Sequence, residues 1–160
     1  MNIIGIDNGV SGSIAVLDQA GAVLFYRATP VTKCLNYTKT KAWINRICME
    51  SMGNILYAYR DSKCGIERPM VNPSRFRSTV SALRALEATQ IALEQQKIPY
   101  EFLDSKEWQR ALLPKGLHKE ELKIASNQVC ARLFPGVQLK RPGDGDSLLI
   151  AEFVRRESKA

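Results

Sequence analysis

Asn-Ile-Ile-Gly-Ile-Asp at residues 2–7 opens the chain with an almost continuous apolar run that ends on a carboxylate. A run of this kind is typical of a strand that is buried on both faces of a sheet. Residues 13–17 and 22–26 have the composition of two more strands, and turn-forming residues at 8–12 and 18–21 separate the three. Because both connections are short, the sequence predicts an antiparallel three-stranded meander.

The rest of the chain alternates between helical and strand patterns. The predicted helices are residues 37–52, 74–96, 104–113, 118–133 and 146–155, and the predicted strands are residues 63–67 and 100–103. A meander followed by alternating helices and strands predicts the α/β class, with a mixed sheet covered by helices. The 160 residues are enough for one domain with a sizeable core and too few for two ordinary domains. We therefore expect a single domain over residues 1–160.

The composition is that of a basic protein without a zinc-binding pattern. The formal net charge is +7 and the pI is about 9.4. This excess favours a polyanionic partner such as nucleic acid, with solubility alone or an anionic membrane surface as alternatives. The four cysteines form no C-x-x-C pair and His118 is the only histidine, so no zinc site is expected. No apolar run approaches the ~18 residues of a membrane span and the start lacks the features of a signal peptide, so we expect a cytoplasmic protein.

Three carboxylates stand where a predicted strand or helix meets a turn. Asp7 and Glu67 each end a short apolar strand, and Asp146 begins the last predicted helix on the same face as its apolar residues. Each also has an ordinary structural explanation. Asp7 can cap the turn that follows it, Glu67 can pair with Arg68 or Arg75, and Asp146 can act as a helix N-cap.

The three carboxylates could converge on one point of the sheet edge. Converged carboxylates repel one another unless divalent cations lie between them, and oxygen-only ligation suits Mg²⁺ or Mn²⁺. Two such ions can activate a water and stabilise the leaving oxygen during phosphodiester cleavage. Asp144, which lies between two glycines, is a fourth candidate, although its position suits an N-cap even better. The residues alone therefore predict a metal-dependent nuclease and leave its substrate open.

At these residues the sequence resembles the RuvC-like Holliday junction resolvases, especially their short phage-type and organellar members. Residues 4–16 are similar to the family's first-strand motif, whose catalytic aspartate corresponds to Asp7. Ile-Glu-Arg-Pro at 66–69 is similar to the motif that carries the catalytic glutamate, and Asp-Ser-Leu-Leu-Ile-Ala at 146–151 resembles the Asp-Ala-Leu-x-Ile-Ala signature of the last helix. The first motif also opens actin-like ATPases and sugar kinases, which need roughly twice this length.

The resemblance implies a ribonuclease H-like fold with a mixed five-stranded sheet flanked by helices. It also implies that Asp7, Glu67, Asp146 and Asp144 are the catalytic and metal-binding residues, with two Mg²⁺ or Mn²⁺ ions in each active site. The family usually has a fourth acid or histidine three or four residues before the acid of the last helix. This chain has a glycine and a proline at those positions, so Asp144 is the nearest replacement.

The implied activity is symmetric cleavage of two strands at a four-way DNA junction by a homodimer, in a bacterial or phage-infected cell. In the family, the long helix after the catalytic glutamate often builds the dimer. Here that helix has an apolar stripe, which suits either a dimer interface or a helix buried within one protomer. The stripe consists of Phe76, Val80, Leu83, Leu86 and Ile91. The alternative functions are another nuclease of the same fold that cleaves RNA–DNA hybrid or structured RNA, and a junction-binding protein without catalysis.

Basic side chains in or beside these motifs are candidates for contacts with DNA phosphates. They are Arg68, Arg75, Arg77, Lys106, Lys115, Lys119, Lys123, Lys140 and Arg141. For each one, a solvated surface charge is the plainer explanation. Among the aromatic residues, Phe76 suits the core or an interface better than a wedge in the junction, and Trp108 suits the core.

Overall fold

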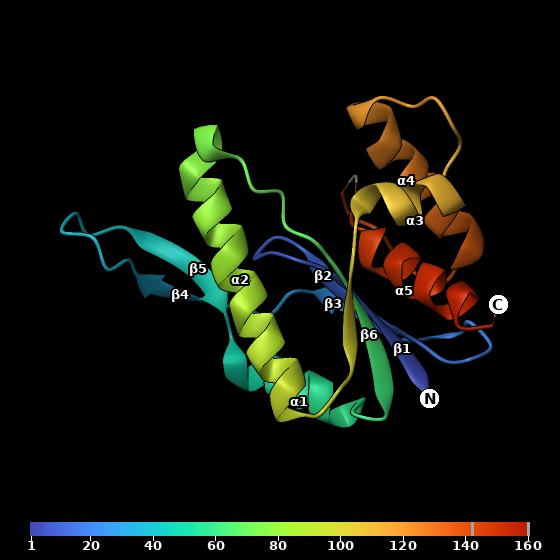
Figure 1. The fold of residues 1–160 in the computed structure, drawn as a ribbon, viewed down its shortest axis with the longest axis horizontal. Helices are drawn as coiled ribbons and strands as arrows, with labels where there is room; N and C mark the ends of the chain where they lie inside the picture. Colours follow the sequence, from blue (N-terminus) through green and yellow to red (C-terminus); the bar gives the residue numbers. More distant parts are fainter. Residues whose placement is uncertain (142, 160) are drawn as a thin grey trace.

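The computed structural model describes residues 1–141 and 143–159. A five-stranded sheet in the order β3-β2-β1-β6-β7 forms its centre (Figure 1). The strands are β1 (Asn2–Asp7), β2 (Ser13–Leu17), β3 (Val23–Ala28), β6 (Ser62–Glu67) and β7 (Tyr100–Leu103). β2 pairs antiparallel with both β1 and β3, whereas β6 pairs parallel with both β1 and β7. The predicted mixed five-stranded sheet is therefore confirmed.

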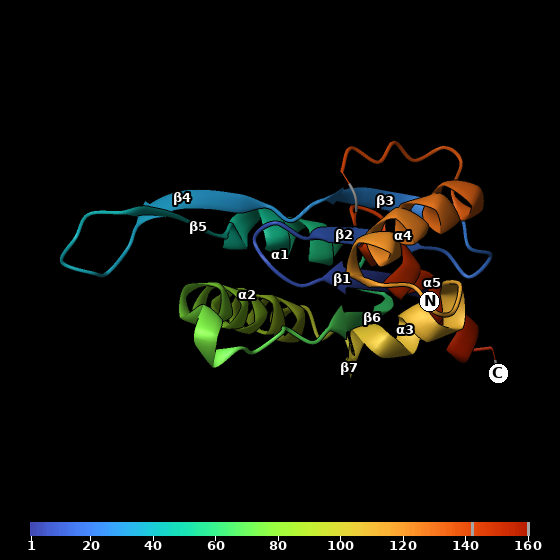
Figure 2. The same cartoon turned by 90° about the horizontal axis from the view of Figure 1, so that it is seen from above.

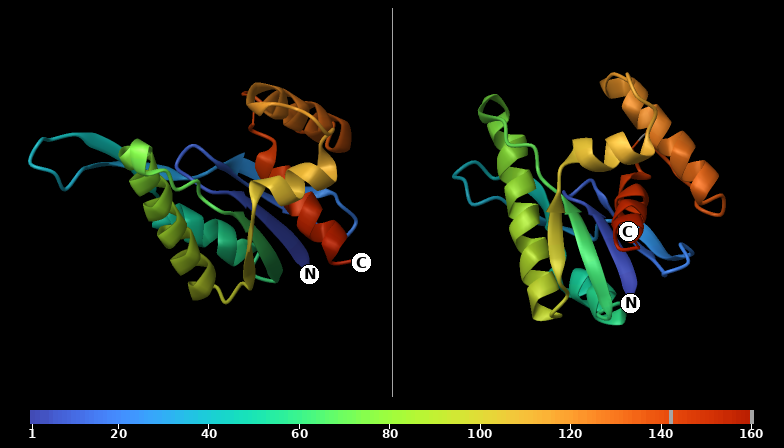
Figure 3. Two further views of the ribbon diagram at one scale, coloured as in Figure 1. Left: turned by 45° about the horizontal axis from the view of Figure 1, so that its top comes forward. Right: turned by 45° about the vertical axis from the view of Figure 1, so that its right-hand side comes forward.

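Helices cover both faces of the sheet, as Figure 3 shows from two directions. The helices are α1 (Met49–Ala58), α2 (Phe76–Gln95), α3 (Ser105–Leu112), α4 (Lys119–Leu133) and α5 (Asp146–Glu157), and a short 3-10 turn covers Pro73–Arg75. One core cluster joins the sheet to α1 and α2, and the other joins it to α3, α4 and α5. None of the described helices is long and apolar enough to span a membrane.

Helix α5 lies directly against the central strand β1, and a glycine makes this possible. A Cβ atom on Gly5 would lie 2.1 Å from the backbone oxygen of Ser147 and 2.5 Å from the backbone nitrogen of Ala151. Real Cβ atoms do not approach other heavy atoms this closely, so the missing side chain sets the distance between strand and helix. That distance in turn sets the position of Asp146, the first residue of α5.

The predicted helix at residues 37–52 is wrong. Val31–Leu35 (β4) and Trp43–Ile47 (β5) form a separate two-stranded antiparallel sheet, and α1 begins only at Met49. The apolar residues of 43–47 do fit a helical spacing. Pairing with the β-branched and apolar residues of β4 gives them cross-strand neighbours instead, and these contacts outweigh a weak local preference. All other predicted elements agree with the structure to within two residues at each end.

The apolar stripe of α2 is exposed to solvent in the protomer. Phe76 is 70% exposed, Leu83 is 42% exposed and Ile91 is 40% exposed. The residues of α2 that enter the core lie on the opposite side of the helix and are Ala85, Thr89, Ala92 and Leu93. The interpretation of the stripe as part of the core of one protomer is therefore wrong for Phe76, Leu83 and Ile91.

Candidate active site

The carboxyl ends of β1 and β6 meet at one edge of the sheet. Ile6 lies opposite Ile66 in the parallel register, so the next residues, Asp7 and Glu67, end the two strands side by side. Their carboxyl groups are close enough to share a proton. The structure thus brings together two of the four acids that the sequence singles out.

Asp146 joins this pair from the helix above the sheet. It begins α5 and its carboxylate accepts a hydrogen bond from Ser126 of α4. Its charge acts on both Asp7 and Glu67 and raises the pKa of each. Three acids from β1, β6 and α5 therefore share one electrostatic environment.

Burial and mutual repulsion make this site costly to ionise fully. Burial, followed by the charge of Glu67, holds the pKa of Asp7 well above its usual range. Burial, followed by the charge of Asp146, raises the pKa of Glu67 to about 7. Burial also raises the pKa of Asp146, although the hydrogen bond from Ser126 and the nearby Lys123 oppose this shift. At neutral pH the site therefore favours a cation or a shared proton.

Asp144 is near the other acids, but its carboxylate is bound within its own loop. The backbone amides of Lys140 and Arg141 donate to its Oδ2 at 3.1 Å and 2.8 Å, and the Arg141 guanidinium lies 3.3 Å from its Oδ1. Its backbone oxygen accepts a hydrogen bond from Tyr26 at 2.7 Å. Its charge contributes to the raised pKa values of Asp7 and Asp146, but it is among the smaller causes.

Two supporting side chains were not assigned to the site from the sequence. Trp108, predicted as a core residue, is fully buried, and its indole N–H also donates to Oε1 of Glu67 at 3.2 Å. Ser126, buried in α4, orients the carboxylate of Asp146. No local sequence motif predicts either contact, because the hydrogen-bond partners lie 41 and 20 residues away in the sequence.

The oxygen atoms at this edge of the sheet are suitable ligands for a hard divalent cation. Besides the carboxylates, the side-chain oxygen of Asn8 is buried and accepts no hydrogen bond, while its nitrogen donates to the backbone oxygen of Ala82 at 3.1 Å. A buried acceptor without a donor is costly unless a cation or water satisfies it. Mg²⁺ and Mn²⁺ prefer oxygen ligands of these kinds. Over residues 1–141 and 143–159, no three Asp, Glu, His or Cys side chains are already arranged as a metal-binding cluster.

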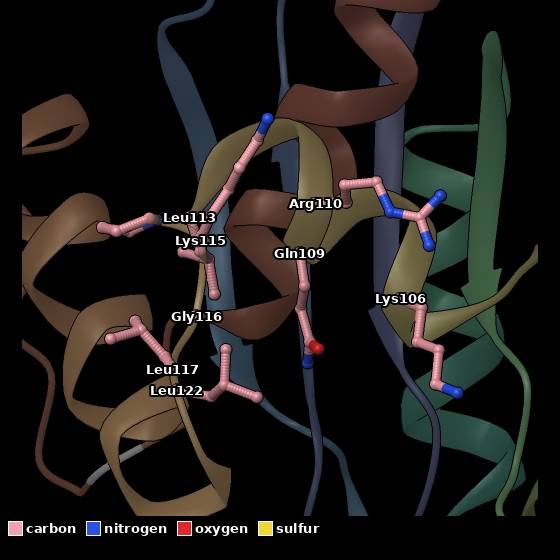
Figure 4. Close-up of a pocket in the computed structure, with 9 residues that line it drawn as sticks. Lys106, Gln109, Arg110, Leu113, Lys115, Gly116, Leu117 and Leu122 are labelled. Carbon is pink, nitrogen blue, oxygen red and sulfur yellow. The ribbon is translucent and has the colours of Figure 1, made fainter.

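The basic residues that the sequence marks for phosphate contacts are all exposed. Arg68 directly follows β6, and Lys106 lies in the first turn of α3, so both lie near the edge that carries the acids. Lys106, Arg110 and Lys115 border a hollow of about 440 Å³ between α3 and the loop that follows it. In Figure 4 these three side chains point in different directions, which suits phosphates spaced along a strand better than one bound anion. None of the four acids lines this hollow.

The protein without metal is expected to lose stability as the pH rises from about 4.5, the usual pKa of a glutamate, to about 7, the raised pKa of Glu67. The raised pKa values of Asp7 and Glu67 mean that the folded state binds protons more tightly than the unfolded chain. The stability that these protons contribute is complete below the unfolded pKa values, near 4, and is lost as the pH rises through the folded values. Thermal unfolding in a chelator across this range measures the fall, and added Mg²⁺ should restore the Tm at the upper end. A Tm independent of pH would contradict a buried, uncompensated carboxylate cluster.

No protein-family model matches the chain, and no curated protein matches it either. The chain is similar to the solved structure of Thermus thermophilus RuvC in complex with a Holliday junction substrate, with a TM-score of 0.68 and 15% sequence identity over 100% of this chain and 98% of that chain. A second Thermus thermophilus RuvC structure matches with a TM-score of 0.58 and 14% identity, over 99% of this chain and 97% of that chain. At this level of identity the likeness establishes the fold. The chain therefore has a RuvC-like fold of the ribonuclease H-like type, as its three motifs predict.

Proposed function

We propose that this protein is an endonuclease that resolves four-way DNA junctions by metal-dependent, symmetric hydrolysis of phosphodiester bonds. The observation that carries the proposal is the partly buried Asp7–Glu67 pair, with raised pKa values, beside Asp146 at the start of α5. The fold similarity supports the choice of substrate, because one similar structure is RuvC bound to a Holliday junction. A basic chain with a formal net charge of +7 suits a polyanionic substrate.

In this proposal, Asp7, Glu67 and Asp146 would hold two Mg²⁺ or Mn²⁺ ions, which when bound would lower the pKa of an attacking water and neutralise charge on the leaving oxygen. Trp108 orients Glu67 through its indole N–H and excludes water from one side of the carboxyl group. Asp144 is the fourth acid of the site. Because its carboxylate is hydrogen-bonded within its own loop, we expect the smallest loss of activity from its substitution.

The exposed basic residues would hold the DNA backbone across the sheet edge. Arginine and lysine side chains bind phosphates without reading sequence, so they suit a structure-selective enzyme. The proposed contacts are Arg68, Arg75, Arg77, Lys106, Lys115, Lys119, Lys123, Lys140 and Arg141. A nuclease of this kind would act in the cytoplasm of a bacterial or phage-infected cell.

Symmetric cleavage requires two active sites, and we propose that the exposed stripe of α2 forms the homodimer interface. Leu83 lies near the middle of that stripe, so Leu83→Glu would place a charge at the centre of an apolar contact in both subunits. The expected result is a change in mass from about 36 kDa, twice the 17.9 kDa of one chain, to the mass of the monomer. Light scattering measures this. Leu24→Glu, at an exposed leucine of edge strand β3, is the matched control and should leave the dimer intact. A wild-type protein that is monomeric with junction bound would contradict paired cleavage.

The proposed activity is tested by incubating the protein with a labelled four-way junction, a matched linear duplex, an RNA–DNA hybrid and a structured RNA. Each substrate is tested with Mg²⁺, with Mn²⁺ and with a chelator. Metal-dependent nicks at symmetric positions of the junction alone are the expected result. Cleavage of another substrate but not of the junction would leave a nuclease with a different target. Tight junction binding without cleavage in either metal would make the protein a binding module.

A further inference from the structure

The hairpin of β4 and β5 extends from the sheet edge that carries the acids. Asp7 pairs with Ser13, and Ser13 pairs with Ala28, the last residue of β3, so the hairpin begins only two strands away from Asp7. With ~4.8 Å between neighbouring strands, the distance from Asp7 to Ala28 is roughly 10 Å. The amide of Thr29 donates to the oxygen of Gly12 at 3.0 Å and fixes the base of the hairpin to the turn after β1. Figure 2 shows the hairpin extending away from the sheet and past α2.

The hairpin is strongly basic and has no acidic residues. Residues 19–49 contain no aspartate or glutamate. All the cations of this stretch are exposed, and they are Arg27, Lys33, Lys39, Lys41 and Arg46. Across the two strands, Lys33 lies opposite Asn45 and Arg46 lies opposite Thr32, so no carboxylate neutralises either one across the strands. None of the ion pairs among the described residues involves these cations.

Two large aromatic side chains of the same hairpin are also exposed. Tyr37, in the loop, is 85% exposed, and Trp43, at the start of β5, is 69% exposed. Trp43 lies across from Leu35, which is exposed as well. Exposed aromatic rings among lysines and arginines are the combination that binds nucleic acids, because cations attract phosphates and rings stack on bases.

We propose that residues 31–47 form a second DNA-binding element, which holds one arm of the branched substrate outside the active site. Its lysines and Arg46 bind backbone phosphates, and Tyr37 and Trp43 stack on exposed bases. A five-residue strand spans ~17 Å, so β4 alone extends over about half a helical turn of duplex, which is about 34 Å. This inference rests on the proposed function for the identity of the substrate.

Charge argues for DNA over a second copy of this chain as the occupant. In a two-fold symmetric contact between hairpins, the same surface would face itself. The four cations of residues 31–47 would then meet four identical cations with no acids between them. A polyanion instead complements every one of these side chains.

The test measures binding of a fluorescent four-way junction in chelator, by anisotropy, over a series of salt concentrations. In Lys39→Ala/Lys41→Ala, the slope of log Kd against log salt is expected to fall by about 1.8, or about 0.9 for each lost phosphate contact. The Kd should rise by about 10-fold or more at low salt. Arg60→Ala/Lys159→Ala removes the same charge near the start of β1, at the sheet edge opposite the acids, and should leave the slope unchanged. In Trp43→Ala, the Kd should rise about 10-fold with no change in slope.

Several results would overturn the inference. A slope and Kd for Lys39→Ala/Lys41→Ala equal to those of the control variant would show that the hairpin does not contact DNA. Conversion of a dimer to a monomer by Lys39→Ala/Lys41→Ala or Trp43→Ala, in light scattering without DNA, would show that the hairpin contacts a second copy. If the wild-type protein binds the junction but cleaves nothing, the proposed catalytic function fails while the hairpin is still tested. If it binds neither junction nor duplex, both proposals fail.

Discussion

Asp7→Asn is expected to reduce junction cleavage on the order of 10³-fold or more while leaving junction binding intact. The substitution keeps the shape of the side chain but removes the charge that a divalent cation needs, at a carboxyl group whose pKa is held well above its usual range. Binding should persist, because the proposed phosphate contacts come from exposed lysines and arginines on other elements. Single-turnover cleavage with enzyme in excess and Mg²⁺ present measures the chemical step apart from binding.

The same substitution is expected to stabilise the protein when metal is absent. Asp7 is partly buried beside Glu67 and Asp146, so its charged form is repelled by both. Replacing it with a neutral amide should raise the Tm in chelator near pH 7.5 by about 3–6 °C, which corresponds to about 1–2 kcal/mol for a protein of this size. The Tm increase on adding Mg²⁺ should also disappear. Substitution of a residue with a purely structural role would lower the Tm. A rise in Tm together with a loss of cleavage therefore distinguishes a metal-binding role from a structural one.

Matched variants identify which acids act together. Glu67→Gln and Asp146→Asn should show the same loss of cleavage as Asp7→Asn. Glu101→Gln, at an exposed acid of β7, is the control and should retain full activity. Asp144→Asn should reduce cleavage less than Glu67→Gln or Asp146→Asn, because the carboxylate of Asp144 is hydrogen-bonded within its loop. Near-normal turnover in Asp7→Asn would remove the metal site from the proposal.

The strands and the positions of the acids could be predicted because local signals agreed with tertiary packing there. An apolar run such as residues 2–7 is stable only between two covered faces, and its final carboxylate must then lie at the edge of the sheet. The same reasoning applied to the strand ending at Glu67. Parallel pairing of the two strands places both acids at one edge.

The hairpin and the orientation of α2 depend on contacts that local patterns do not contain. β5 forms a strand because β4 supplies its cross-strand partners. Such pairing depends on contacts between two segments, which the residue pattern of one segment does not contain. In α2, the small residues Ala85 and Ala92 face the core, because they allow the helix to lie close to the sheet. Of its larger apolar residues, Leu93 enters the core, whereas Phe76, Leu83 and Ile91 are exposed. The apolar spacing of the helix alone therefore could not decide between a dimer interface and the core of one protomer.

Gly5→Ala is expected to destabilise the protein by about 3 kcal/mol or more, which would lower the Tm by about 10 °C. The added methyl group would lie 2.1 Å and 2.5 Å from backbone atoms of Ser147 and Ala151. Backbone atoms within a packed helix cannot rotate away as a side chain can, so α5 would have to move off β1. That movement would also displace Asp146, because Asp146 begins α5. Thermal unfolding measures the first effect, and the shift in Tm on adding Mg²⁺ measures the second.

Gly53→Ala, in the middle of α1, is the matched control, and its effect should have the opposite sign. A Cβ atom there meets no heavy atom within 4 Å, and glycine in a helix interior costs roughly 0.5–1 kcal/mol relative to alanine. Gly53→Ala should therefore raise the Tm slightly and leave Mg²⁺ binding unchanged. If Gly5→Ala were as stable as Gly53→Ala, α5 could not lie against β1 at the observed distance. Asp146 would then lie elsewhere, and close packing of α5 on β1 would not explain why the first motif carries Gly5 two residues ahead of Asp7.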